Sequence, residues 1–126
     1  MWIDGTCSHS VRKTIISKFK ENISVVCLMA TYKVGGVGLN LTNANHVILA
    51  DLWWNPSVED QAVDRTHRLG QEKEVTVYKM IMNDTIEEKI LKLQDKKRNM
   101  RDNIMDESVS AEGNGITTND LIELLL

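Results

Sequence analysis

Hydrophobic and polar positions along the chain alternate between helical and strand-like patterns. Apolar side chains at helical spacing, with lysines opposite, predict a first helix over residues 10–20, with Val11, Ile15, Ile16 and Phe19 as its apolar stripe. Short apolar, β-branched runs at residues 23–29 and 46–51 predict strands buried on both faces. Residues 74–81 predict a third strand.

Two further helices carry start signals. Asn55 and Pro56 are typical of an N-cap and a first helical position, and this helix is expected to run to about Leu69 and stop at Gly70. Residues 84–87 resemble a capping box at the start of a long helix whose apolar stripe is Ile86, Ile90, Leu93 and Met100. A polar linker and a short apolar helix follow.

Alternating helices and strands predict the α/β class with a largely parallel sheet. Three strands are few for an independent sheet of this kind, and we expect no strand before the first helix. The sequence therefore reads as one that starts inside a domain. We predict a chain of marginal stability with an exposed sheet edge.

Composition and charge narrow the class of protein. A length of 126 residues fits one domain. The formal net charge of −3 lacks the basic surplus of an independent nucleic-acid-binding domain, so any such contact must be local or shared with another part of the protein. Cys7 and Cys27 lack the spacing of a disulfide framework or a zinc site, and we interpret them as reduced thiols. With no signal-peptide pattern and no long apolar run, we expect a soluble intracellular chain.

The glycine-rich turn at residues 35–40 is a candidate phosphate or ribose contact, because glycines allow close backbone approach and exposed N–H groups attract anions. It completes neither the dinucleotide fingerprint nor the phosphate-binding P-loop. A simple tight turn stays an equal alternative on these residues alone.

A second constellation lies in residues 61–71. Gln61, Arg65 and Arg68 are four and three residues apart, so they share one face of the predicted helix. Arginine forks bind phosphate oxygens in a bidentate manner, as arginine fingers do in phosphoryl transfer. A solvated polar face with an Asp64–Arg68 ion pair is the alternative of similar weight.

Three blocks together resemble motifs V and VI of the Swi/Snf family of DNA-dependent ATPases, within helicase superfamily two. They are Gly-Gly-Val-Gly-Leu-Asn-Leu-Thr at 35–42, Asp-Leu-Trp-Trp-Asn-Pro at 51–56 and Gln-Ala-Val-Asp-Arg-Thr-His-Arg-Leu-Gly-Gln at 61–71. Asp-Gly-Thr at 4–6 matches a family turn, and residues 85–90 resemble the start of the family's brace helix. The closing helix and residues 93–97 look similar to the branch of RING-bearing repair translocases and transcription-release factors.

The resemblance implies an architecture and a division of the chain. Residues 1–83 would be a partial RecA-like second helicase lobe, a parallel sheet with flanking helices. Residues 84–105 would form the brace helix, 106–119 a linker and 120–126 a short C-terminal helix.

The resemblance also implies roles. Arg68 and Arg65 match the arginine fingers, with Arg68 favoured, and Gln61 lines the nucleotide cleft. The remaining implied residues are Gly36, Gly38 and Asn40 for ATP binding, and Thr31, Lys33 and Trp54 for DNA binding. We interpret His67 as a positioning or packing residue rather than a base, and one of Trp53 and Trp54 as core packing.

The sequence departs from the family in two ways. Val34 stands where alanine is common, and no Gly-Lys-Thr loop or Asp-Glu-x-His magnesium site is present. Phosphoryl transfer needs the lysine, the metal carboxylate and the arginines together, so we expect the isolated chain to be inactive and Mg²⁺ to be held by a first lobe.

We predict the C-terminal motor lobe of a nuclear, ATP-dependent double-stranded DNA translocase or chromatin remodeller. Its partners would be DNA, the N-terminal helicase lobe and chromatin, transcription or repair proteins, with no membrane. A short non-catalytic interaction module derived from such a lobe is the alternative. A free-standing nucleotide-binding domain is disfavoured, because neither phosphate-loop fingerprint is complete.

Overall fold

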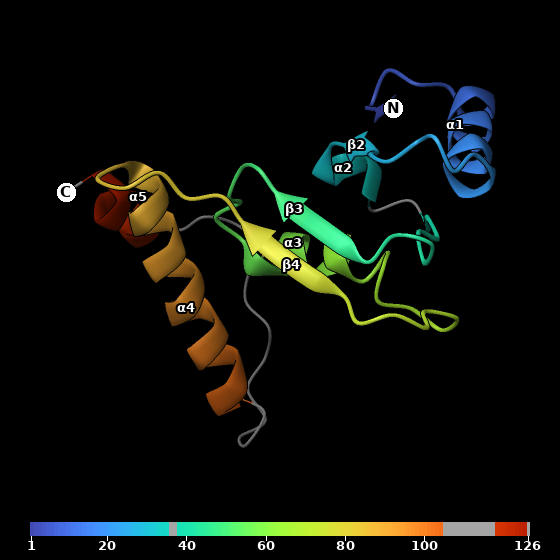
Figure 1. Cartoon of the computed structure of the whole chain (residues 1–126). Helices are drawn as coiled ribbons and strands as arrows, with labels where there is room; N and C mark the ends of the chain where they lie inside the picture. Colours follow the sequence, from blue (N-terminus) through green and yellow to red (C-terminus); the bar gives the residue numbers. More distant parts are fainter. Residues whose placement is uncertain (36–37, 105–117, 126) are drawn as a thin grey trace. The chain divides into compact units, whose positions relative to one another are not determined.

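The computed structural model describes residues 1–35, 38–104 and 118–125, which Figure 1 draws in sequence colours. Contacts divide the chain into two compact units, Met1–Val47 with Asp60–Val77, and Ile48–Glu59 with Tyr78–Leu126. The elements in chain order are β1 Trp2–Ile3, α1 His9–Glu21, β2 Met29–Ala30, α2 Tyr32–Gly35, β3 His46–Leu49, α3 Pro56–Val63, β4 Thr76–Lys79, α4 Ile86–Ile104 and α5 Thr118–Leu125.

The core of the first unit forms around Ile3, which is fully buried in β1. Leu39 is buried beside it, and Ile15 and Ile16 of α1 pack against this pair, as the helical stripe predicted. β1 pairs in parallel with β2, Ile3 opposite Ala30. The expectation of no strand before the first helix was therefore wrong.

The predicted buried strand at residues 23–29 was also wrong. Only Met29 and Ala30 are in a strand, while Ile23 and Val26 are 97% and 91% exposed. Asn22 explains the difference, because its carbonyl accepts from the N–H of Val25 at 2.9 Å and its side chain from the N–H of Ser24 at 3.0 Å. These local bonds hold the segment in a turn, in competition with a strand ladder.

β3 and β4 confirm the two later strands, in shortened form. The N–H of Thr76 donates to the carbonyl of Asn45, and that of Met80 to Leu49, at 2.9 and 3.0 Å. Both pairs have the same offset in sequence, so the strands are parallel, as their arrows in Figure 1 also show. The expected burial of 46–51 on both faces was wrong, since Ile48 is 65% exposed.

α3 begins as the sequence predicts and ends earlier. The side-chain oxygen of Asn55 accepts from the N–H of Ser57 at 3.1 Å, and Pro56 is the first helical residue. The helix ends at Val63, whose carbonyl accepts from both the N–H and the hydroxyl of Thr66. These bonds tighten the chain into turns, so the predicted extension to Leu69 was wrong.

In the second unit, the hydroxyl of Thr85 accepts from the N–H of Glu87 at 3.3 Å at the start of α4. The carboxylate of Glu87 accepts from the N–H of Met82 at 2.6 Å and not from the residue that precedes the helix, so the predicted helix start is confirmed but the reciprocal bonds of a capping box are not formed. α5 begins at Thr118, two residues before the expected start, and residues 106–117 of the predicted linker lie outside the described residues. No helix in the described ranges is long and apolar enough to cross a bilayer.

Candidate functional site

Two sequence segments meet in the first unit through backbone contacts. The N–H of Leu41 donates to the carbonyl of Arg65 at 2.8 Å, and Nη1 of Arg68 donates to the carbonyl of Leu39 at 3.5 Å. Residues 38–41, at the end of the glycine turn, therefore lie directly against residues 65–68. The structure brings together most of the candidates that the sequence assigned to ATP.

The glycine-turn side of this junction is shaped by local geometry. Gly38 has a φ of +47°, a left-handed conformation that glycine adopts without a steric penalty. The side-chain oxygen of Asn40 accepts from the N–H and the hydroxyl of Thr42 at 3.1 and 2.9 Å, closing a short turn. Gly36, the remaining candidate here, lies outside the described residues.

The arginine side departs from the single helical face that the spacing predicts. Gln61 is exposed in the last turn of α3, whereas Arg65 and Arg68 lie in the turns that follow. Nε of Arg65 donates to the carbonyl of Gln61 at 3.1 Å. Gln61 therefore lies on the helix and the two arginines in the turns after it, so the three residues do not form a stripe on one helix face.

Two residues that the sequence did not single out hold this segment in place. Thr66 is buried and its hydroxyl donates to the carbonyl of Val63 at 2.7 Å. The amide of Gln71 donates to the carbonyls of Ala44 and Thr66 at 2.8 and 3.1 Å. Both residues lie inside a polar run, where sequence pattern cannot separate a supporting side chain from a solvated one.

The arrangement presents guanidinium groups at the surface. Arg68 is exposed, and with His67 and Gly70 it borders a hollow of about 540 Å³. A guanidinium carries five N–H donors, and Arg68 uses one in its bond to Leu39. The remaining donors suit an oxyanion such as a phosphoryl group.

The DNA candidates divide between the two units. Thr31 follows β2, its N–H donating to the carbonyl of Ile3 at 3.3 Å, and Lys33 is exposed on α2. Trp54 belongs to the second unit and is half-buried there. The ammonium of Lys97 lies 4.7 Å from the centre of its indole, a cation–π contact.

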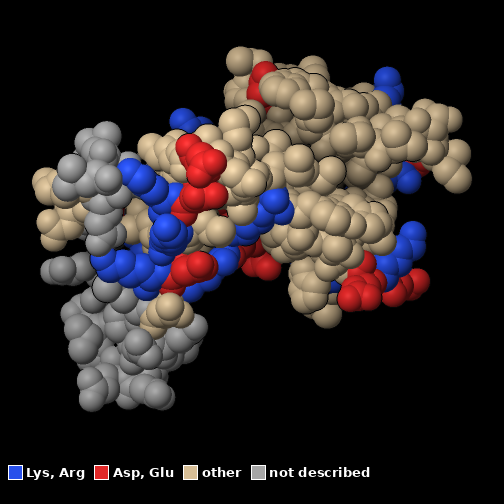
Figure 2. Space-filling model, turned by 60° about the vertical axis from the view of Figure 1, so that its left-hand side comes forward, with Lys and Arg blue, Asp and Glu red and all other residues tan. Residues whose placement is uncertain are grey.

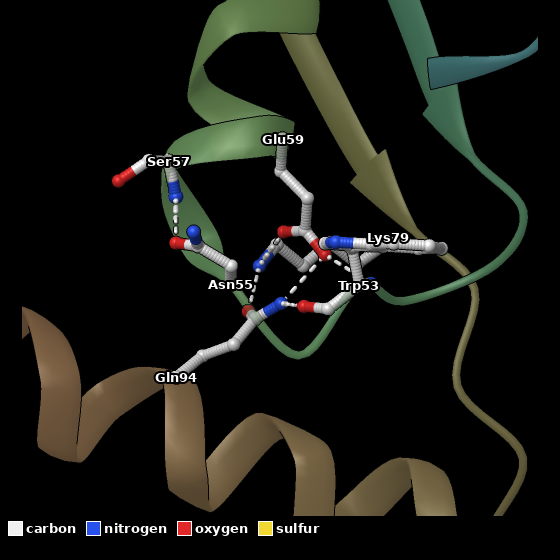
Figure 3. A network of polar contacts seen from close by, with 6 residues as sticks. All are labelled: Trp53, Asn55, Ser57, Glu59, Lys79 and Gln94. Atoms are coloured by element: carbon white, nitrogen blue, oxygen red, sulfur yellow. Dashed lines mark hydrogen bonds and ion pairs between the residues drawn. The ribbon is translucent and has the colours of Figure 1, made fainter. Parts of the chain in front are cut away.

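The second unit contains a buried polar network (Figure 3). The carboxylate of Glu59, on α3, is 1% exposed and forms an ion pair with Nζ of Lys79 at 2.7 Å. Gln94 of α4, fully buried, donates from its amide to Glu59 at 2.6 Å and accepts from Lys79 at 2.8 Å. A carboxylate this deep needs such partners, because burying an unpaired charge is costly.

The network also holds the backbone of Trp53. Its N–H donates to the carboxylate of Glu59 at 3.0 Å, and its carbonyl accepts from the amide of Gln94. Sequence analysis missed Glu59 and Lys79. A glutamate one turn after the N-cap of α3 is indistinguishable in sequence from a helix-start acid on the surface.

Charge at the surface is locally patterned. Figure 2 shows Lys and Arg side chains close together on one part of the visible face, with acidic groups among them. On α4, Lys89, Lys92 and Lys96 line a hollow together with Leu93.

At the amino end, the carboxylate of Asp4 accepts from the hydroxyl and N–H of Thr6 and from the indole of Trp2. These bonds, that of the Thr6 hydroxyl first, hold the pKa of Asp4 well below its usual range.

Comparisons with known proteins agree on the kind of domain. The profile described as helicase conserved C-terminal domain matches residues 1–70. The DNA repair protein rad8 of Schizosaccharomyces pombe is 53% identical over 75% of this chain and 8% of its own length. A second relative comes from Arabidopsis thaliana and is named as a putative SWI/SNF-related matrix-associated actin-dependent regulator of chromatin, subfamily A member 3-like 1. It is 38% identical over 98% of this chain and 14% of its own length.

A solved structure extends the likeness to the fold. The crystal structure of the C-terminal part of the Fun30 ATPase domain aligns with 85% of this chain, with a TM-score of 0.72 and 36% sequence identity. The alignment covers 39% of the Fun30 chain. The predicted α/β class and RecA-like lobe are thereby confirmed.

Proposed function

Because the chain belongs to the helicase conserved C-terminal domain family, with Swi/Snf-family ATPases as its relatives, we propose that it is the second motor lobe of an ATP-dependent double-stranded DNA translocase. The chain spans 8% and 14% of the length of the two relatives above. The activity of a whole protein is therefore part of the proposal.

On the nucleotide side, Arg68 and Arg65 contact the γ-phosphate when the two lobes close on ATP. Gln61, Gly36, Gly38 and Asn40 line the same cleft. The observation that carries this proposal is the joining of residues 38–41 to residues 65–68 by the Leu41–Arg65 and Arg68–Leu39 hydrogen bonds. It gives exposed guanidinium donors a fixed position beside a glycine turn.

ATP bound with Mg²⁺ supplies the phosphoryl group and the charge neutralisation for hydrolysis. Mg²⁺ would be held by the first lobe, since the residues at this junction are cationic and amide groups rather than the carboxylates that Mg²⁺ prefers. The chain alone then lacks two of the three parts of phosphoryl transfer and is inactive.

On the DNA side, Thr31 and Lys33 contact the backbone, and Trp54 lies beside the tracked strand. Opening and closing of the lobes moves these residues stepwise along the duplex. The protein works in the nucleus, on chromatin or on transcription or repair complexes, through DNA and its own N-terminal helicase lobe. We place it in the branch of RING-bearing repair translocases and transcription-release factors.

The test is Arg68→Ala in the intact native polypeptide. ATP hydrolysis is measured with and without double-stranded DNA, and ATP binding with a fluorescent nucleotide. We expect DNA-stimulated turnover to fall by about 10³-fold or more, as arginine fingers contribute, with ATP binding retained. Arg68→Lys also loses most activity, because a lysine lacks the bidentate fork.

Lys73→Ala serves as the control, since Lys73 is an exposed cation on the wall of the same hollow. It should turn over ATP like the unmodified protein. Normal turnover by Arg68→Ala would contradict the arginine-finger role. A native polypeptide without DNA-stimulated hydrolysis would contradict the motor function and favour a non-catalytic interaction module.

A further inference from the structure

We propose that Gln94 and Lys97, one helical turn apart on α4, are positioning residues that fix the Trp53–Trp54 segment, so that α4 sets the geometry of the DNA contact made by Trp54. The inference rests on the proposed function for that contact. Neither side chain is assigned to DNA itself. Both act on the tryptophans from inside the second unit.

Gln94 holds the peptide bond between Trp53 and Trp54 in place. The carbonyl of Trp53, which belongs to that peptide, accepts from the amide of Gln94, and the N–H of Trp53 is taken by Glu59. Both backbone polar groups of Trp53 are thus held by side chains from α3 and α4 (Figure 3). Gln94 is fully buried, so water does not compete for these bonds.

Lys97 fixes the indole that follows. Its ammonium lies 4.7 Å from the centre of the Trp54 ring and 3.1 Å from a carboxylate oxygen of Asp120 on α5. The carboxylate and the π-face attract the same cation, so the side chain of Lys97 is held between them. Trp54 is therefore constrained at its backbone by Gln94 and at its ring by Lys97.

Simple packing does not require this chemistry. A buried ion pair and its hydrogen bonds are often replaceable by apolar side chains without loss of stability. What a polar network provides is a single orientation, because its bonds are directional. A movement of α4 would consequently be transmitted to Trp54 by both links.

The test uses Lys97, because removing Gln94 would leave buried Glu59 with fewer donors and disturb folding. The intact native polypeptide is labelled with 5-fluorotryptophan, and the ¹⁹F resonance of Trp54 is assigned from its absence in Trp54→Phe. Lys97→Met removes the cation, Lys97→Arg keeps it, and Lys92→Met removes an equal charge from an exposed position on the same helix.

Lys97→Met should shift the Trp54 resonance and raise the DNA concentration for half-maximal ATP hydrolysis by roughly three- to tenfold, with turnover at saturating DNA unchanged. Lys97→Arg and Lys92→Met should match the unmodified protein in both readouts. An unshifted resonance in Lys97→Met overturns the inference.

An unchanged DNA requirement in Lys97→Met also overturns it, provided that Trp54→Ala raises the requirement. If Trp54→Ala leaves the DNA requirement unchanged, the DNA contact of the proposed function is wrong, and the inference falls with it. The arginine-finger assay on Arg68 is independent of this outcome.

Discussion

The N–H of Leu41 donates to the carbonyl of Arg65 at 2.8 Å, across 24 positions of sequence. This bond joins the segment after the glycine turn to the segment of the two arginines. A change in the backbone of residues 38–41 is therefore expected to displace residues 65–68, and the reverse. The arginines owe their placement to residues 38–41 as well as to α3.

Gly38→Ala should destabilise the chain by about 1 kcal/mol, because an L-residue pays for the left-handed φ of +47°. A Cβ at this position meets nothing within 4 Å beyond its chain neighbours, so the cost comes from the local backbone conformation and not from a clash with another part of the chain. Urea unfolding measures it. Gly5→Ala is the matched control, since its Cβ is also unobstructed and its φ is not left-handed. Equal effects of the two changes would exclude the conformational explanation.

Glu59→Ala should cost about 3 kcal/mol of unfolding free energy, because it removes the carboxylate that neutralises the partly buried Lys79 and accepts from Gln94 and the backbone of Trp53. Lys79→Met leaves Glu59 unpaired and should cost a similar amount. The combined change of Glu59, Lys79 and Gln94 to Leu, Met and Leu should recover most of the loss. Additive losses in the triple variant would show that the three do not act as one network.

Asn55→Ala should cost about 1 kcal/mol of unfolding free energy, since the N–H of Ser57 loses its acceptor at the start of α3. Asn55→Asp retains an acceptor and should be nearly neutral. Thermal unfolding by circular dichroism distinguishes the two variants. A loss as large in Asn55→Asp as in Asn55→Ala would argue against the cap.

Asp4 should titrate below the ordinary aspartate value of about 3.9. A folded-state pKa lowered in this way stabilises the amino-terminal turn above pH about 4, and the contribution is lost as pH falls through the folded pKa. NMR titration of the carboxyl carbon measures it. Thr6→Ala removes the main donor and should raise the pKa toward the ordinary value, whereas Thr14→Ala should not.

Periodicity and caps predicted several elements in their correct order, but neither β1 nor α2. The start of α3 at Pro56 and the stripe of Ile15 and Ile16 follow from local pattern, and the parallel pairing of β3 with β4 follows from the alternation of helices and strands along the chain. The motifs at residues 35–42, 51–56 and 61–71 identified the family from sequence alone. The helix start and the apolar stripe depend on residues close together in sequence, which is why local pattern sufficed for them.

Long-range partners decided the features that pattern missed. β1 is two residues long and forms only because β2 lies beside it. The end of α3 is a local exception: the helix stops at Val63 because Thr66, three residues later, donates to its carbonyl, which the apolar and polar pattern does not reveal. The roles of Arg68, Gln61 and Trp54 are predictions that rest on the family resemblance.

Glu59, Lys79 and Gln94 come from α3, β4 and α4, and each satisfies the others in the interior. We expect every single change among them to be destabilising, and a joint change to apolar residues to recover most of the loss. Over evolutionary time, such a trio should be inherited as a unit. Among homologous sequences, replacement of Glu59 by an apolar residue should accompany replacement of Lys79 and Gln94, a correlated substitution pattern that sequence alignments of the family would record.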